Sequence, residues 1–307
     1  MIASSQPLSG SAHTRACVDG SPELEKLAQE LTARGIGAAE CIRIAKNVNG
    51  PESCAEVAHY KKQLGLAADF DGLERVILRH ATLNFGSQID LLPVPASVKI
   101  LIQKEFGQFQ GPLSAKNSLL TGTDPFVTAC KITTLRRFPA GPMDWVVSGL
   151  PWSWLKKMQP GQIAPALWYT FQTFGGRRPA FYVHLAHPPR NRSLVIENEV
   201  RKAYFRMAQA LKLQPHIKGI MTAAWFHDPE ALKENPHLAA LNEPYLQHGG
   251  KLVASLGGAP ADSGFLAFNR QRRKEYEEGK HRYHLTLAMW PRQRAIAWAD
   301  LHPELEK

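Results

Sequence analysis

Apolar residues in the first part of the chain recur at the spacing of helices. Leu24, Leu27 and Leu31 lie three and four positions apart, ahead of the helix-breaking stretch "RGIG". Similar patterns continue as far as "ASVKILIQKEFGQF". We therefore expect residues 21–115 to form a helical region, and the polar, turn-rich opening over residues 1–20 to be a flexible tail.

The pattern changes to the period of a strand at the start of the remaining part, residues 116–307. Apolar and polar residues alternate from Cys130 to Arg137, ahead of a turn at "FPAGP". This alternation predicts a strand that forms a hairpin with "MDWVVSGL". The segment "PWSWLKKMQPGQIAPALWYTFQTFGG" then predicts two short helical pieces that separate at "QPGQ".

Strands and helices alternate in the rest of the chain. An apolar strand over 181–187 leads into a long helix over about 192–213, and a second strand over 217–226 follows. Two further apolar strands, "KLVASL" and "HLTLAMW", flank a charged run. The order predicts an α/β fold, in which a helical N-terminal region precedes a mixed sheet flanked by helices. Because a helix connects the first two strands, we expect them to run parallel.

The composition favours a globular protein that binds anionic molecules. Its net charge of +10 favours phosphorylated cofactors, acidic lipids or nucleic acid. The charged run "RQRRKEYEEGKHR" mixes acids with bases and has one aromatic residue, so we expect a solvated helix and no nucleic-acid partner. The four cysteines lack CxxC spacing, and no apolar stretch approaches about 20 residues. The opening has no apolar middle of a secretory signal, which predicts a cytoplasmic protein.

The junction between the first of these strands and the long helix gathers ionisable side chains. His184 lies in an apolar strand, where it is either a core residue or a general base. Glu197, in the first turns of the helix, is the alternative base. The loop "HPPRNRS" brings Arg190, Asn191 and Arg192 to the helix start. Free amides there predict a site for a cofactor phosphate or, alternatively, a capped and solvated helix end.

Other candidate residues are spread along the α/β part. Ser148 in "VVSGL" is either a catalytic residue or a turn residue, and we expect Arg137 to add positive charge at the mouth of the crevice. The candidates for substrate binding are Trp152, Trp154, His216 and Trp225. The segment "GLPWSWLKKM" suits a groove for an apolar chain, a membrane surface, or a helix packed on the sheet. The twelve histidines lack metal-site spacing, so no metal is expected.

The order of elements from about residue 125 onward resembles that of GNAT-type acyltransferases. In that family the strand followed by the long helix forms the acyl-CoA or acyl-carrier site, and a Gln/Arg-x-x-Gly-x-Gly/Ala loop holds the pyrophosphate. The corresponding "HPPRNRSL" keeps arginines and lacks both glycines. The segments "RRFPAGPMDWVVSGLPWSWL", "PHIKGIMTAAWFHDP" and "NPHLAALNEPYLQHGG" also resemble bacterial proteins of unassigned function.

The resemblance implies an acyltransferase that uses acyl-CoA or acyl carrier protein as co-substrate. The acceptor would be an amine or hydroxyl of a small or lipid-like molecule, and His184 or Glu197 would be the base. Two other interpretations stay open. One is a non-catalytic binding module for an apolar or lipid-like ligand, with a peripheral membrane contact through the tryptophan-rich segment. The other is a metal-dependent oxygenase, which requires histidines and acids to converge.

Overall fold

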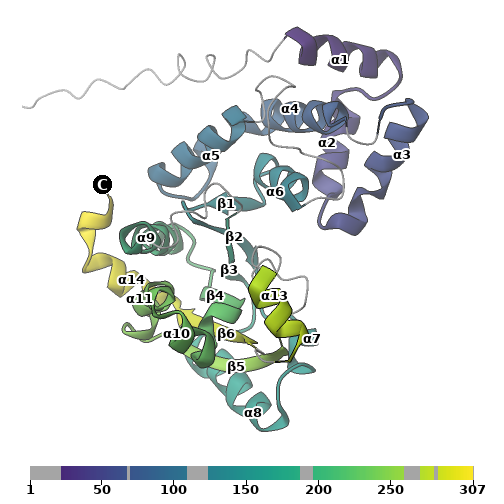
Figure 1. Ribbon diagram of the computed structural model, residues 1–307. Helices are drawn as coiled ribbons and strands as arrows, with labels where there is room; N and C mark the ends of the chain where they lie inside the picture. The colour runs from purple at the N-terminus through teal and green to yellow at the C-terminus, as the bar shows by residue number, and fades with distance from the viewer. Residues whose placement is uncertain are drawn as a thin grey trace, which may run out of the picture. The chain divides into compact units, whose positions relative to one another are not determined.

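The chain folds into two compact units. The computed structural model describes residues 22–67, 70–108, 124–186, 196–258, 270–279 and 283–306. Unit 1 consists of Met1–Leu92 and Lys99–Phe138, and unit 2 consists of Pro93–Val98 and Pro139–Lys307. Figure 1 shows the helices and strands of both units with the labels used below. Among the described residues, the structure contains no helix with the length and apolar character needed to cross a membrane.

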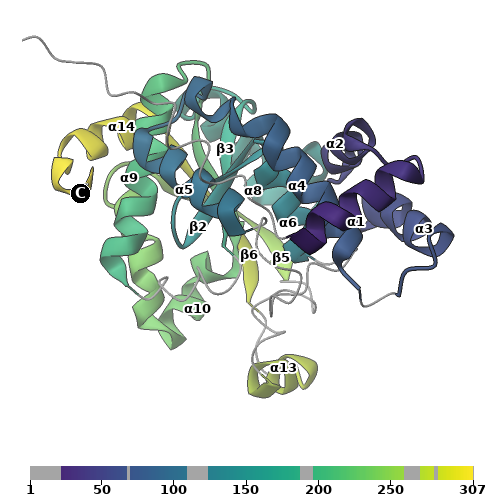
Figure 2. The same ribbon diagram turned by 90° about the horizontal axis from the view of Figure 1, so that it is seen from above.

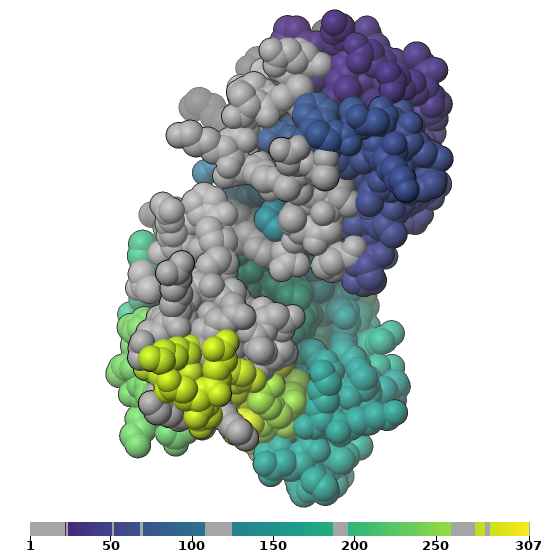
Figure 3. Space-filling view, turned by 45° about the vertical axis from the view of Figure 1, so that its right-hand side comes forward, coloured from purple at the N-terminus to yellow at the C-terminus, as the bar shows by residue number. Residues whose placement is uncertain are grey.

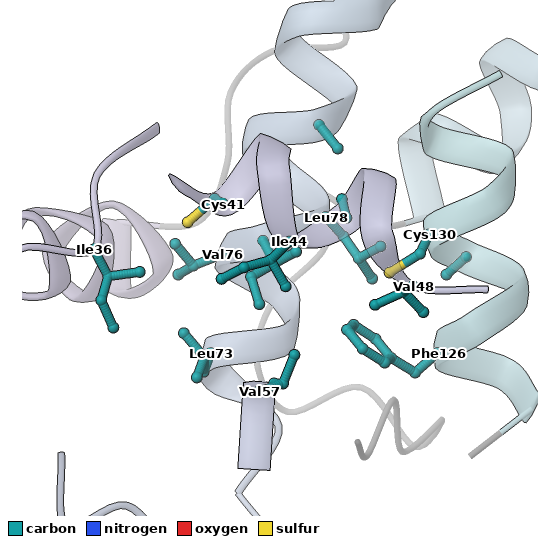
Figure 4. Packing of buried hydrophobic residues seen from close by; sticks show 14 of the residues in the cluster. Ile36, Cys41, Ile44, Val48, Val57, Leu73, Val76, Leu78, Phe126 and Cys130 are labelled. Atoms are coloured by element: carbon teal, nitrogen blue, oxygen red, sulfur yellow. The ribbon is translucent and has the colours of Figure 1, made fainter. Parts of the chain in front are cut away.

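Unit 1 is built from helices. They are α1 (Pro22–Ala33), α2 (Ala38–Asn47), η1 (Pro51–Cys54), α3 (Ala55–Gln63), α4 (Gly72–Gly86), η2 (Ile89–Leu91), α5 (Ala96–Gln108), whose first residues belong to unit 2, and α6 (Asp124–Thr133). Figure 4 shows their core, in which Ile44 of α2, Leu78 of α4 and Phe126 of α6 pack together. The helical interpretation of this region is therefore correct for the residues that the structure describes.

The strand that the alternation from Cys130 to Arg137 predicts was wrong. Most of this stretch is helix α6, and the strand that precedes the turn is only β1 (Arg137–Pro139). The buried residues Phe126, Ala129 and Cys130 recur three and four positions apart, which is the period of a helix packed on a core. The Thr133 hydroxyl donates to the Ala129 carbonyl oxygen at 2.9 Å, one turn earlier in the helix, so this threonine is accommodated in α6.

Unit 2 is organised around a mixed sheet. The described strands form a six-stranded sheet in the order β1-β2-β3-β4-β6-β5. Besides β1, whose first two residues are assigned to unit 1, they are β2 (Met143–Ser148), β3 (Ala180–Leu185), β4 (Gly219–Ala224), β5 (Lys251–Gly258) and β6 (His284–Pro291). β3 and β4 run parallel, whereas the β2–β3, β4–β6 and β5–β6 pairs are antiparallel. The predicted parallel pairing and the predicted fold class are both confirmed.

Helices cover both faces of this sheet. The described helices of unit 2 are α7 (Trp152–Leu155), α8 (Pro160–Trp168), the π-helix η3 (Tyr169–Thr173), α9 (Glu197–Leu213), η5 (Trp225–His227), α10 (Pro229–Glu234), η6 (Pro236–Leu241), α11 (Glu243–Leu246), α13 (Arg270–Glu277), α14 (Arg292–Asp300) and η7 (Pro303–Glu306). Figures 1 and 2 show α9 and α14 together on one side of the sheet. On the opposite face, Ala166 of α8 packs in a core cluster with Met221 of β4 and Leu287 of β6.

The alternation of side chains along β3 assigns its residues to the two faces. Tyr182 and His184 lie on the α7–α8 face, where their ring centroids are 4.6 Å apart. Phe181 lies on the other face and contacts Trp145 of β2, with ring centroids 5.4 Å apart. His184 therefore shares a face of the sheet with Tyr182 and lies opposite Phe181.

Candidate functional site

A cleft opens in the middle of the sheet, where β3 and β4 separate. Their ladder holds only two residue pairs, Phe181–Ile220 and Tyr182–Met221. Past these pairs lies a cavity of about 160 Å³. It is lined by Met143, Tyr182, Val183, His184, Leu185, Tyr204, Thr222, Ala223, Ala224, Trp225, Phe226 and Leu285. Because these residues come from both faces of the sheet, the cleft passes between the two strands.

Each of the two strands stays paired along its length with its outer neighbour. β3 pairs with β2 from Ala180 to Leu185, and β4 pairs with β6 from Gly219 to Ala224. A side chain replaces part of the missing ladder, since the Thr222 hydroxyl donates to the Val183 carbonyl oxygen at 3.4 Å. Strand edges that do not pair with each other can hydrogen-bond an extended ligand placed between them.

His184 lines this cleft and is partly exposed. Its partner across the antiparallel ladder with β2 is Asp144, a fully buried residue. Residues directly opposite each other in such a ladder share a face, and their Cβ atoms are about 4.5–5.5 Å apart. A carboxylate at this position is therefore within reach of the His184 imidazole, which it can orient and, once protonated, stabilise.

Two tyrosines supply further polar groups at the cleft. Burial raises the pKa of Tyr182 to about 12, and a hydrogen bond with the backbone of Ala223 opposes the rise. The Tyr182 hydroxyl is therefore protonated at neutral pH and reaches from β3 to β4. Burial also raises the pKa of Tyr204, whose hydroxyl donates to the Leu241 carbonyl oxygen at 2.9 Å. Tyr182 is thus the better placed of the two to donate a proton to a bound molecule.

A buried polar cluster lies directly after the lining residues Trp225 and Phe226. The Asn242 amide nitrogen donates to the Phe226 carbonyl oxygen at 2.9 Å, so its Oδ1 atom faces His227 Nδ1. The Tyr245 hydroxyl lies 2.5 Å from Asn242 Oδ1 and 2.8 Å from His227 Nδ1. Burial lowers the pKa of His227 to about 4, so this histidine is neutral at pH 7. The cluster fixes the backbone that forms one end of the cleft.

The structure brings only some of the predicted residues to the cleft. His184 and Trp225 line it, and Trp154 packs against Tyr182 with ring centroids 5.6 Å apart. Trp152 is exposed, and the Arg177 guanidinium lies over its ring, with Cζ 4.4 Å from the ring centroid.

The remaining candidates lie elsewhere. Ser148 is exposed and pairs with Ala180, at the end of β3 remote from His184, and exposed His216 and Glu197 are not among the lining residues. Arg137 belongs to unit 1, where its Nη1 atom lies 3.2 Å from the Thr128 hydroxyl. The predicted phosphate-binding residues Arg190, Asn191 and Arg192 fall outside the described residues.

Within the described ranges, no group of three His, Cys, Asp or Glu side chains is arranged to hold a metal ion. His227 and Asp228, which could otherwise join His184 as metal ligands, make other contacts. His227 belongs to the buried cluster, and Asp228 caps α10 by accepting from the Glu230 amide at 2.8 Å. Asp228 also accepts from the His284 amide at 2.7 Å.

Sequence reasoning missed Asp144, Tyr182 and Thr222. Asp144 stands in an apolar strand, and a charged residue fully buried in a strand is a signal for a partner or a function. The partner could not be read from the sequence, because it lies 40 positions away and depends on the register between β2 and β3.

Comparisons with known proteins find similarity only among solved structures. No protein-family model matches the chain, and no curated protein matches it. The chain is similar to an acyltransferase in complex with decanoyl-CoA, with a TM-score of 0.41 and 11% identity over 71% of this chain and 65% of the other. It is also similar to an acyltransferase in complex with decanoyl-CoA and teicoplanin, with a TM-score of 0.40 and 10% identity over 72% and 67%. The chain thus spans less than two thirds of the first of these proteins.

Proposed function

We propose that the chain is a GNAT-like acyltransferase, which moves an acyl group from the thioester of CoA to an amine or hydroxyl acceptor. The observation that carries this proposal is the cleft between β3 and β4. It is a narrow slot through a sheet, with unpaired strand edges and apolar walls. Such a slot suits an extended chain with amide groups, which is the chemistry of the pantetheine arm of CoA.

The phosphates of CoA would lie at the start of α9. The N-cap residue Ile196 makes no side-chain cap to the first amides of the helix, although its carbonyl oxygen accepts from the Glu199 amide at 3.0 Å. Glu197 and Glu199 in the first turn oppose an anion there, whereas Arg190 and Arg192 of the preceding loop favour one. The loop is therefore the proposed phosphate site, as the sequence predicts.

In the proposed reaction, His184 Nε2 or Nδ1 takes a proton from the acceptor as its nitrogen or oxygen attacks the thioester carbonyl carbon. The carbonyl oxygen becomes an oxyanion, which backbone amides at the parted strand edges stabilise. The C–S bond then breaks, and the thiolate receives a proton from the Tyr182 hydroxyl or the His184 imidazolium. Asp144 is a positioning residue, because it acts on the imidazole and not on the substrate.

The test is release of free CoA thiol from acyl-CoA in the presence of primary amines and alcohols. We expect acceptor-dependent release by the wild-type chain, and a decrease in turnover of about 10²–10⁴-fold in His184→Ala. Ser148→Ala is the matched control for a polar residue away from the cleft. Unchanged turnover in His184→Ala, together with wild-type folding, would show that His184 is not the base.

A further inference from the structure

Helix α8 and η3 present an apolar face to solvent. Gly161, Ala164, Pro165, Trp168 and Phe171 are exposed and follow one another at helical spacing; we refer to them as the α8 face. Trp168 is 70% exposed and Phe171 is 51% exposed. Figure 3 shows the segment that holds α7 and α8 on the near surface of unit 2, in teal.

The opposite side of the same helix is buried against the sheet. Ala166 and Thr170 are fully buried, and Ile163 and Tyr169 pack on the core cluster below them. A helix on the surface of a globular protein usually carries polar residues on its outer side. Since α8 is apolar on both sides, its outer side is suited to a second apolar environment.

Three cations lie beside Tyr169 and Gly175, which are close in sequence to Trp168 and Phe171 of the α8 face. Lys251 Nζ lies 5.7 Å from the centroid of the Tyr169 ring, and the Lys218 side chain packs along Gly175, just after η3. Arg294 is close enough to Tyr169 that its charge opposes the rise of the pKa that burial causes in that tyrosine. Within the described ranges, Lys218, Lys251 and Arg294 form no ion pair with an acid.

The sequence around the α8 face has no negative charge. Residues 145–196 contain no Asp or Glu, and their basic residues are Lys156, Lys157, Arg177, Arg178, Arg190 and Arg192. A helix with exposed aromatic residues, in a segment that carries only basic charges and has further cations beside it, fits the interface of an anionic lipid bilayer. The aromatic side chains would enter the region between headgroups and acyl chains, and the cations would stay at the headgroups.

We propose that the α8 face binds the surface of an anionic lipid membrane. A second copy of the chain is a poorer occupant, because a two-fold symmetric dimer through this face would bring these cations against an identical set of cations. The membrane contact does not depend on the proposed acyl transfer, because it uses none of the residues that line the cleft.

The test is co-sedimentation of the full chain with vesicles of phosphatidylcholine alone and of phosphatidylcholine mixed with phosphatidylglycerol. We expect binding to the mixed vesicles only, weakening as salt rises. Trp168→Ala/Phe171→Ala should lower the affinity at least about ten-fold, since two aromatic side chains lose their apolar contact. Lys251→Gln and Arg294→Gln should each lower it about five-fold. Leu301→Ala is the control, because Leu301 is 71% exposed and lies outside the α8 face.

Absence of binding to the mixed vesicles at low salt would overturn the proposal. The same holds if the double aromatic variant binds as well as Leu301→Ala. Sedimentation velocity tests the alternative occupant, a second copy of the chain. A wild-type dimer that becomes monomeric in Trp168→Ala/Phe171→Ala, with no change in vesicle binding, would show that a second copy covers the α8 face.

Discussion

Acid should destabilise unit 2 through His227, the buried histidine behind the cleft. Its pKa is about 4 in the folded protein, against an ordinary value of 6.5. The unfolded chain therefore binds a proton at a pH where the folded protein does not. The contribution of neutral His227 to the free energy of unfolding is complete above pH 6.5 and is lost as the pH falls from 6.5 towards 4. The gap between the two pKa values corresponds to about 3 kcal/mol of unfolding free energy.

The assay is urea unfolding at a series of pH values between 7 and 4, followed by tryptophan fluorescence. All seven tryptophans belong to unit 2, so their emission reports this unit and not unit 1. The comparison is with His227→Gln, whose amide can donate to Asn242 Oδ1 and does not titrate. Other groups titrate in both proteins, so the difference between them isolates residue 227.

We expect the wild-type protein to lose about 3 kcal/mol more than the variant between pH 7 and pH 4. The variant starts from a lower stability at pH 7, so the two curves should converge as the pH falls. Parallel curves over this range would refute the reasoning, because they would mean that folding does not shift the pKa of His227.

Two further perturbations test the site and unit 1. Asp144→Asn should lower kcat of acyl-CoA turnover. It should also shift the acidic limit of the pH–rate profile to lower pH, because a neutral amide no longer favours the protonated form of His184. A pH–rate profile identical to that of the wild-type protein would show that Asp144 has no part in the mechanism. Lys61→Met should destabilise unit 1 by about 3–5 kcal/mol, because it removes the ammonium group 3.0 Å from the fully buried Glu74 carboxylate. Far-UV circular dichroism measures that loss of stability. The double variant Lys61→Met/Glu74→Gln should recover part of it. A loss no larger than that of a variant of an exposed lysine would contradict the prediction.

Local patterns were sufficient to predict the central part of unit 2. The strand that contains His184, the long amphipathic helix after it and the following parallel strand each carry their own periodicity, and a helical crossover fixes the parallel direction. The alternation of side chains along a strand also accounts for the opposite faces of Phe181 and Tyr182.

The stretch around Cys130 shows where local patterns fail. A run of small and β-branched residues fits a strand and a buried helix almost equally well over a few positions. The segment forms a helix because of the core of unit 1, where Phe126 and Cys130 fill space beside α2 and α4. That packing is tertiary information, which the period of a short segment does not contain.

The cleft could not be predicted either, because it depends on where a ladder stops. Nothing in the residues of β3 or β4 shows that they pair only at Phe181 and Tyr182 and then separate. The same limit applies to Asp144, which reaches His184 only through the register of β2 on β3. Sequence identified His184 and Trp225 among the lining residues, whereas Asp144, Tyr182 and Thr222 became visible only through the pairing of strands distant in sequence.

Binding of acyl-CoA in the cleft is the central claim, and calorimetric titration tests it most directly. Acetyl-CoA and a medium-chain acyl-CoA are titrated into the wild-type chain, into Ala223→Phe and into Ala239→Phe. Ala223 lines the cleft, so a phenylalanine there fills the space between the strands, whereas Ala239 is exposed in η6. The account predicts one binding site in the wild-type chain and in Ala239→Phe, and no measurable binding in a folded Ala223→Phe variant. Equal binding by all three proteins, or none by the wild-type chain, would contradict it.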